Sequence, residues 1–310
     1  MLNILVKNIS KRLPDAWHHQ VKYALYFKKL PHLSKPTGFS EKIMRRKIYP
    51  RSIYTTLSDK FKVREFIAGL WGEEYLVELY AHGTELSYDM FRQLPNAFVL
   101  KANHGSGYNR LVFDKRQVSY AELYDLSNAW MRSNFYEQSR EKHYLDIEPC
   151  IMVERMLLDG EQVPNDIKFH CFNDNHEIRM FIQVDYQRFG THRRDIFDID
   201  WNRTEIRISL PNADEPMPRP TRLDEMIRLA RQTAQQFSYV RVDFYQVGEK
   251  VYFGELTFTP GAGLSKLMPK NIEQEWGIAG FDQSIHRIDL PADVFRENLP
   301  DLGIVQQRAD

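Results

Sequence analysis

Two neighbouring stretches of the chain, residues 239–247 and 251–258, alternate between apolar and polar side chains at every second position. An alternation with a period of two is typical of a β-strand with one buried face. Gly248-Glu249-Lys250 separates the two runs, so the pattern predicts an antiparallel hairpin. The positions expected on its apolar face are Val240, Val242, Phe244, Tyr252, Gly254, Leu256 and Phe258.

The register of the predicted hairpin follows from parity. A two-residue loop at Gly248-Glu249 would place Glu255 among the apolar residues, whereas a three-residue loop keeps those residues on one face and pairs Asp243 with Glu255. Because a slip by one residue turns a whole strand over, burial favours the three-residue loop. Two carboxylates side by side repel each other and need a cation between them. Two interpretations stay open: the pair binds Mg²⁺, or Arg241 neutralises Asp243 on a solvated face.

Periodicity elsewhere predicts both helices and strands. Apolar residues recur at helical spacing over 55–70, 119–144 and 223–237, and Ser119 with Glu122 matches a capping box at the start of the second helix. Shorter runs predict strands at 98–101, 110–113, 149–157, 165–172 and 176–184. The chain therefore mixes helices and strands along its length.

Residues 105–107, Gly-Ser-Gly, predict a flexible turn between two strands. Glycines let backbone N–H groups approach phosphate oxygens closely, and Lys101, four residues before the first glycine, adds a positive charge. A strand follows where a P-loop or a dinucleotide-binding turn would need a helix, which excludes both motifs. A phosphate cradle and an ordinary turn stay open. Lys60 lies near a helix start, where lysine is unfavourable, and this indicates an anionic partner.

The segment 185–203 concentrates positive charge between strands, with Arg188, His192, Arg193 and Arg194. Guanidinium groups match the geometry of carboxylates and phosphates, so one interpretation is recognition of an anionic substrate. The other is a solvated loop in which these side chains pair with nearby aspartates. Both interpretations stay open.

Composition narrows the class of protein. Of 310 residues, 43% are hydrophobic, which is enough for a large core. Lys and Arg together number 42, as do Asp and Glu, so the overall charge gives no indication of a nucleic-acid partner. Two cysteines are too few for a disulfide framework, and we expect a reducing, cytoplasmic location. We expect neither a transmembrane helix nor a signal peptide, because the apolar runs are too short.

Residues 1–50 are rich in basic and aromatic side chains. This composition fits weak peripheral docking of the N-terminus to the inner, anionic surface of a membrane. It also fits an ordinary amphipathic helix packed on the body of the protein, which we favour because the amphipathic pattern is not strong.

The chemical features follow one another in a set order along the chain: SDKFKVREF, FVLKANHGSG, DIKFHCFN, HRRDIFDIDW, and, as the most specific, RVDFY followed by VYFGELTFTPGAG. Two lysines, a glycine turn and two carboxylates suit ATP binding and phosphoryl transfer. In order and spacing the chain resembles the ATP-grasp superfamily, and more closely the TupA-like ATP-grasp proteins found with bacterial polysaccharide genes. The resemblance covers roughly residues 39–277.

The resemblance implies an α+β ATP-grasp fold, in which two α+β lobes clamp the nucleotide beneath a mobile glycine-rich hairpin. It divides the chain into an N-terminal helical and α+β subdomain at 1–92, a lid subdomain at 93–148, a C-terminal core with the metal site at 149–290, and a loose tail at 291–310.

The resemblance also implies roles for individual residues. Lys60 and Lys101 would hold the phosphates and act in catalysis with Arg241, which would position an acyl phosphate. The residues implied for nucleotide binding are Lys60, Lys101, His104, Gly105, Ser106, Gly107, Glu154, Arg155, Met156, Leu157, Asp166 and Lys168. Those implied for the anionic substrate are Arg188, His192, Arg193 and Arg194.

For the metal, the resemblance implies that Asp243 and Glu255 bind Mg²⁺. Thr257 stands at the second metal position, where many ATP-grasp enzymes have an asparagine. A threonine hydroxyl is a weaker Mg²⁺ ligand than an amide oxygen, so a water molecule would complete the coordination.

The chemistry implied is ATP-dependent ligation of a carboxylate to an amine through an acyl phosphate, with ATP and Mg²⁺ as cofactors. The partners expected are an amino acid and a carboxylate-bearing sugar, a uronic acid of a bacterial surface polysaccharide or its precursor. Two alternatives stay open: an ATP-grasp protein that transfers a phosphoryl or sugar group in the same pathway, and a non-catalytic assembly protein with a degenerate site.

Overall fold

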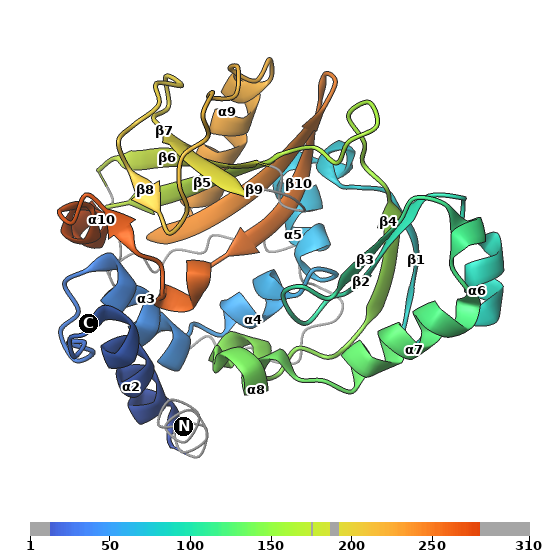
Figure 1. Ribbon diagram of the computed structural model, residues 1–310, viewed down its shortest axis with the longest axis horizontal. Coiled ribbons are helices and arrows are strands. Elements are labelled where there is room, and N and C mark those ends of the chain that lie inside the picture. Colours follow the sequence, from blue (N-terminus) through green and yellow to red (C-terminus); the bar gives the residue numbers. More distant parts are fainter. Residues whose placement is uncertain (1–12, 175, 187–191, 280–310) are drawn as a thin grey trace, which may run out of the picture.

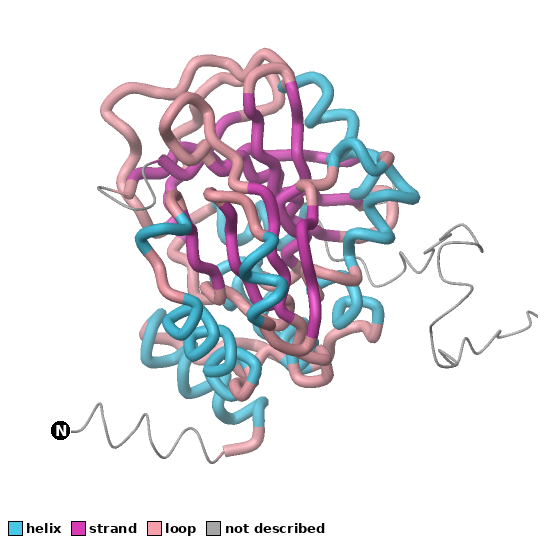
Figure 2. Tube along the Cα trace, turned by 90° about the vertical axis from the view of Figure 1, so that its right-hand side faces the viewer, coloured by secondary structure: helices cyan, strands magenta, loops and turns pink. Residues whose placement is uncertain are grey.

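The computed structural model describes residues 13–174, 176–186 and 192–279. Helices and antiparallel sheets together make an α+β fold, as expected (Figure 1). Figure 2 shows the strands grouped in the middle of the molecule, with helices around them. The four-stranded sheet has the order β1 (Leu79–Gly83), β4 (Ile151–Arg155), β2 (Phe98–Ala102) and β3 (Asn109–Val112). The five-stranded sheet has the order β10 (Lys250–Thr257), β9 (Tyr239–Val247), β5 (Asp166–Asn173), β6 (Ile178–Tyr186) and β7 (Arg193–Phe197).

One face of the five-stranded sheet is apolar and forms the largest core. Helices α5 (Val63–Trp71) and α9 (Leu223–Ala234) pack against this face, and the indole of Trp71 stacks on the ring of Phe244 with 5.3 Å between centroids. The helix predicted at 223–237 is confirmed and ends at Ala234. Because strand residues alternate between faces, the opposite face of this sheet is left to polar side chains.

The four-stranded sheet has its own core beneath α6 (Tyr88–Gln93) and α7 (Tyr120–Met131). That core includes Leu86, Leu94, Phe98, Leu100, Leu123 and Trp130. Burial alternates along β2, so Val99 and Lys101 point to the side away from α7. β1 and β4 join β2 and β3 in this sheet, so strand pairing crosses the boundaries expected at 92/93 and 148/149.

Two helices predicted as continuous are interrupted, in each case by a side chain that caps a new turn. Between α4 (Ile53–Ser58) and α5, Asp59 Oδ1 accepts hydrogen bonds from the backbone N–H groups of Phe61 and Lys62. The segment 119–144 divides into α7, α8 (Phe135–Ser139) and a 3₁₀ turn (Lys142–Tyr144), because Asn134 Oδ1 accepts from Tyr136 N. Such local hydrogen bonds compete with continuation of a helix.

The predicted capping box at α7 is half formed. Ser119 Oγ accepts a hydrogen bond from Glu122 N at 3.1 Å, as expected of an N-cap. The Glu122 carboxylate does not return to the cap, because it pairs with Arg110 on β3 at 3.0 Å.

A third group of elements closes one end of the polar face. It consists of α2 (Asp15–Phe27), α3 (Phe39–Ile48), α10 (Ile272–Ala279) and the short sheet of β8 (Arg207–Ile208) with β11 (Leu267–Met268). The core that α3, α10, β8 and β11 share with the five-stranded sheet includes Phe39, Ile43, Phe172, Ile208, Tyr239, Leu267 and Trp276. Further 3₁₀ turns lie at Glu73–Tyr75, Lys115–Gln117 and Pro260–Gly263. Across the ranges that the structure describes, no helix has the length and apolar character needed to cross a membrane.

Candidate active site

The β9–β10 hairpin has the predicted pairing but a different turn. Asp243 lies opposite Glu255 and Arg241 opposite Thr257, as parity predicts. The predicted three-residue loop is wrong, because Val247 pairs with Lys250 and leaves a two-residue turn. A β-bulge between Phe253 and Glu255 restores the register.

The bulge explains both the glycine at position 254 and the side chains of the outer half of β10. A Cβ atom on Gly254 would lie 3.0 Å from the backbone oxygen of Asp243. On the turn side of the bulge, Phe253 belongs to the apolar core of the five-stranded sheet. Tyr252, the residue predicted for that core, is not part of it. Its hydroxyl accepts a hydrogen bond from Arg155 Nη2 at 2.5 Å.

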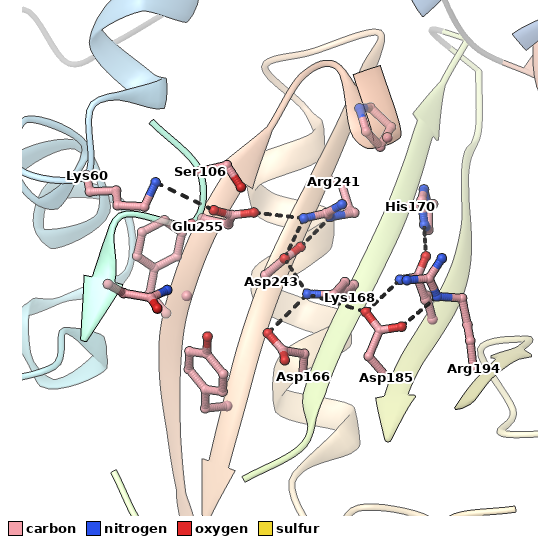
Figure 3. Close-up of a pocket in the computed structure, with 18 of the residues that line it drawn as sticks. Lys60, Ser106, Asp166, Lys168, His170, Asp185, Arg194, Arg241, Asp243 and Glu255 are labelled. Atoms are coloured by element: carbon pink, nitrogen blue, oxygen red, sulfur yellow. Dashed lines mark hydrogen bonds and ion pairs between the residues drawn. The ribbon is translucent and has the colours of Figure 1, made fainter. Parts of the chain in front are cut away.

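Arg241 lies between the two carboxylates of the hairpin. Its Nε donates to Asp243 Oδ1 at 2.7 Å, and its Nη2 donates to Asp243 Oδ2 at 2.7 Å and Glu255 Oε1 at 2.8 Å (Figure 3). Burial alone would raise the pKa of Glu255, but the charges of Lys60 and Arg241 lower it to about 2. Burial alone would lower the pKa of Arg241, yet Asp243 and Glu255 raise it above its usual value.

Lys168 lies at the centre of the polar face, among three aspartates from three strands (Figure 3). Its Nζ is 3.0 Å from Asp166 Oδ1, 3.0 Å from Asp243 Oδ2 and 3.8 Å from Asp185 Oδ2. All four side chains are almost completely buried. A buried charge is costly unless it is paired, and here every charge has an opposite partner.

A chain of hydrogen bonds continues from Asp185 across the face. Arg194 Nε donates to Asp185 Oδ1 at 2.5 Å, and Gln183 Nε2 donates to Asp185 Oδ2 at 3.0 Å. Gln183 Oε1 therefore faces His170 Nε2, 3.0 Å away, so that this nitrogen must carry the proton. Burial and the charge of Arg241 lower the pKa of His170 to about 3, and the ring is neutral at pH 7.

Two more lysines contribute to the site: Lys101 on β2 of the four-stranded sheet, and Lys60 in the segment between α4 and α5. Lys101 Nζ lies 2.5 Å from Glu154 Oε2, and Arg64 Nη1 donates to Glu154 Oε1 at 3.1 Å. Lys60 Nζ donates to the backbone oxygen of Gly105 at 2.6 Å and lies 3.9 Å from Glu255 Oε2. Burial lowers the pKa of Lys60, and the carboxylate of Glu255 opposes this effect.

These groups surround a polar cleft of about 380 Å³ between the two sheets. Next to it is a pocket of about 480 Å³ with a largely apolar lining that includes Val77, Val99, Leu111, Met156, Leu157, Val163 and Pro164. The two cavities share Lys101, Glu154 and Asp166 on their walls, so they adjoin. An apolar pocket that opens onto a charged cleft suits a ligand with a flat ring system and an anionic chain.

Most residues implied by the sequence resemblance meet at these two cavities. The cleft is lined by Lys60, Lys101, Ser106, Gly107, Glu154, Asp166, Lys168, His192, Arg194, Arg241, Asp243 and Glu255. The apolar pocket adds Arg155, Met156 and Leu157.

Five implied residues are not on these walls or are outside the described structure. The ring nitrogens of His104 bond beneath the turn, with Nε2 3.0 Å from Trp130 O, and Gly105 contributes its carbonyl to Lys60. Arg193 donates to Asn212 O at 3.5 Å, on the other side of β7 from Arg194. Arg188 lies outside the described residues. The fifth is Thr257, whose Oγ1 donates to Glu255 Oε1 at 2.9 Å.

Sequence reasoning missed several residues of the cleft, among them Arg64, Gln183, Asp185 and Tyr245. Gln183 and Asp185 alternate with buried Ile182 and Val184 along β6, and that period-two pattern was a signal for a second polar face. No local signal indicates Arg64, because its contact with Glu154 depends on how the lobes meet.

The residues present fit a Mg²⁺ ion. In the part of the chain that the structure describes, no group of three or more His, Cys, Asp or Glu residues could hold a metal. Asp243 and Glu255 are hard oxygen ligands side by side, and Mg²⁺ typically binds one or two carboxylates plus phosphate oxygens and water. The Thr257 hydroxyl donates a hydrogen bond to Glu255 Oε1, and Thr257 as a third ligand stays a prediction.

The chain is similar to a known family in sequence and to solved structures in fold. A family model for TupA-like ATPgrasp proteins matches residues 41–279. No curated protein sequence matches the chain. D-alanyl-alanine synthetase A from Vibrio cholerae aligns with a TM-score of 0.42 at 11% identity, over 76% of this chain and 64% of that one. D-Alanine-D-alanine ligase from Helicobacter pylori gives a TM-score of 0.43 at 12% identity, over 73% and 61%.

The chain spans less than two thirds of the length of these two enzymes. The family match, by contrast, covers most of the chain and includes both sheets and the cleft between them. On that basis, this protein belongs to the TupA-like ATP-grasp family.

Proposed function

We propose that the protein is an ATP-dependent ligase that joins a carboxylate to an amine through an acyl phosphate. The observation that carries the proposal is that Arg241, Asp243 and Glu255 of the hairpin meet Lys101 of the four-stranded sheet and Lys60, which lies between α4 and α5, in one polar cleft beside an apolar pocket. Phosphoryl transfer needs positioning and charge stabilisation of this kind.

The apolar pocket would take the adenine ring. Val99, Leu111 and Leu157 offer apolar contact on its walls. In the described structure, the backbone N–H groups of Met156 and Leu157 have no backbone partner, so they remain available to the edge of a base. The Glu154 carboxylate is engaged by Lys101 and Arg64, and its role would be to hold Lys101 toward the phosphates.

The phosphate chain would extend into the cleft between Lys60, Lys101 and Lys168. Lys60 joins the glycine turn to the hairpin, because it contacts both Gly105 and Glu255. Closure of the lobes would thus bring the turn over the phosphates. Asp243 and Glu255 would hold Mg²⁺, which supplies charge neutralisation at the transferring phosphoryl group.

In the proposed reaction, a substrate carboxylate oxygen attacks the γ-phosphorus of ATP, and ADP leaves. The amine then attacks the acyl carbon, phosphate leaves with the C–O electron pair, and the amine loses a proton. Arg241 would bind the acyl phosphate, since its guanidinium is fixed by Asp243 and Glu255 and lines the cleft.

We further propose that the carboxylate belongs to a uronic acid of a bacterial surface polysaccharide or its precursor, and the amine to an amino acid. The support is the resemblance to proteins found with polysaccharide genes, together with Arg194 and His192, which line the cleft beyond Lys168. Arg194 donates from Nε to Asp185 and from Nη1 to Ile208 O, so its guanidinium is held in one orientation. A guanidinium fixed in this way selects a ligand by its geometry.

The test is ADP release from Mg-ATP by the purified protein, with mixed amino acids and mixed uronic acids, beside Glu255→Gln. The proposal expects release that needs both mixtures and is lost in the variant. Release that needs a uronic acid but no amine would instead identify a phosphotransferase. ATP binding without turnover under any mixture would contradict the ligase assignment for free sugars and amino acids.

A further inference from the structure

Helix α2 has one side buried against the body of the protein and an outward side with apolar residues. His18, His19 and Tyr23 are buried against the body of the protein. Trp17, at 61% exposure, and Leu25, at 46%, lie on the other side. Val21 and Ala24 complete an i, i+4, i+7, i+8 stripe on this outward side, and the stripe contains no charged residue. An apolar helix face of this kind is normally covered.

Directly after the end of the helix, at Phe27, the chain exposes a further apolar side chain and two lysines. Leu30 is 70% exposed, and the side chains of Lys28 and Lys29 before it are also exposed. Tyr26, at 37% exposure, has Lys266 Nζ 5.3 Å from its ring centroid. We call Trp17, Val21, Ala24, Leu25, Lys28, Lys29 and Leu30 the α2 face.

The N-terminal segment that contains α2 is strongly basic, although the whole chain is balanced at 42 basic and 42 acidic residues. Residues 1–50 contain eleven lysines and arginines and two acids, Asp15 and Glu41. Asp15 is itself paired, with Arg140 at 3.1 Å and Lys142 at 3.5 Å. Glu41 and Glu273 lie close enough to Lys29 to interact with it, yet lysines and arginines outnumber acids in this segment by a wide margin.

We propose that the α2 face docks on the surface of an anionic lipid bilayer. Tryptophan and leucine on one side of a helix, with lysines at its edge, form the pattern of a helix that lies in the membrane interface. Tryptophan and tyrosine rings favour the headgroup level, and lysines are attracted to anionic lipids. An anionic bilayer fits both features of the α2 face. Its hydrocarbon layer takes up the apolar stripe, and its negatively charged surface attracts the lysines.

The place of α2 in the fold allows such docking without blocking the cleft. Figure 1 shows α2 at the periphery, on the opposite side of the molecule from α6 and α7 of the four-stranded sheet. None of the residues of the α2 face lines the cleft or the apolar pocket. The proposal is independent of the reaction, so failure of one leaves the other intact.

The test is co-sedimentation of the full chain with vesicles of phosphatidylcholine alone and of phosphatidylcholine mixed with phosphatidylglycerol. We expect binding to the mixed vesicles only, weakened by salt. Lys28→Gln with Lys29→Gln should lower the partition coefficient about 25-fold, since each lysine contributes about fivefold. Trp17→Ser with Leu25→Ser should lower it at least about tenfold.

Matched controls are Phe113→Ser, at an aromatic side chain that is 55% exposed on the other lobe, and Lys250→Gln, at an exposed lysine of the hairpin turn. Both should bind vesicles like the wild type, and circular dichroism should show all variants folded. Three results would overturn the proposal: no wild-type binding to anionic vesicles, equal binding by the α2 variants, or a wild-type dimer that the Trp17 and Leu25 substitutions dissociate.

Discussion

Arg241 Nη2 donates a hydrogen bond to Glu255 Oε1 at 2.8 Å, from the neighbouring strand of the same hairpin. The same nitrogen is 2.7 Å from Asp243 Oδ2. The cation that two adjacent carboxylates require is thus supplied by the chain itself. Of the two oxygens of the Glu255 carboxylate, Arg241 bonds only to Oε1, and Oε2 lies 3.9 Å from Lys60 Nζ. The proposed binding of Mg²⁺ by Asp243 and Glu255 is therefore compatible with the ion pair to Arg241.

Replacing Arg241 by glutamine should leave the two carboxylates without their shared cation. We expect the free energy of unfolding to fall by about 3 kcal/mol, because one charge of a largely buried pair is left uncompensated. Added Mg²⁺ should then raise the melting temperature more than in the wild type, since the metal replaces the lost charge. Urea unfolding and thermal melts, each with and without Mg²⁺, measure both effects.

The control is Arg116→Gln, which breaks the ion pair with Asp114 at a guanidinium that is 83% exposed. It should lower stability much less than Arg241→Gln does, because an exposed ion pair contributes little, and it should add no response to Mg²⁺. Equal losses in the two variants would contradict the role of Arg241 given above.

Substituting alanine for Gly254 should disturb the bulge that pairs Asp243 with Glu255. The added Cβ would lie 3.0 Å from a backbone oxygen, which cannot move as a side-chain end can. We expect a loss of about 1–3 kcal/mol in stability and a weaker response to Mg²⁺. Gly83→Ala is the matched control, because its one tight contact would be the mobile methyl of Met90 at 3.1 Å, and the backbone oxygen of Glu85 would lie at an ordinary contact distance of 3.6 Å. If both variants unfold alike, the bulge has no special demand for glycine.

Replacing Thr257 by valine distinguishes a metal ligand from a residue that orients one. Because the hydroxyl donates to Glu255 Oε1, its loss removes one hydrogen bond, worth about 1 kcal/mol. The Mg²⁺ concentration at half-maximal nucleotide binding should therefore rise by less than about tenfold. A much larger rise, rescued by Thr257→Asn, would show direct coordination instead.

His170 should make the protein less stable as the pH falls. Its pKa is lowered from 6.5 to about 3 in the folded state, so between these values the unfolded chain binds a proton that the folded chain does not. Stability then decreases with falling pH, by up to about 1.4 kcal/mol per pH unit from this residue. In His170→Gln that contribution is absent, so urea unfolding between about pH 6 and pH 4 should show a shallower slope. Identical slopes would mean that the imidazole titrates normally in the folded state.

The sequence was sufficient to pair Asp243 with Glu255 but not to find how the pairing arises. Parity requires one extra residue somewhere between the two carboxylates, and the turn was the simplest place for it. The structure puts it at Gly254, next to the site, where it also exchanges Tyr252 for Phe253 in the core. A pattern of alternation constrains the number of inserted residues and leaves their position open.

Helical periodicity failed for a different reason. Asp59 and Asn134 have polar side chains that bond to backbone N–H groups two or three residues ahead, and each begins a new turn inside an apolar repeat. The break at Asp59 has a consequence for the site, because it places Lys60 between two helices, within reach of Gly105. The network of Gln183, Asp185 and Arg194 depends on strand order, which no local pattern specifies.

The central claim is that the cleft binds Mg-ATP through Asp243, Glu255 and the lysines that face them. Isothermal titration calorimetry with ATP, in the presence and absence of Mg²⁺, tests it most directly in the wild type and Glu255→Gln. We predict one site that requires Mg²⁺ in the wild type and loses that dependence in the variant. Absence of Mg²⁺-dependent binding in the wild type, or equal binding by the variant, would contradict the account of this site.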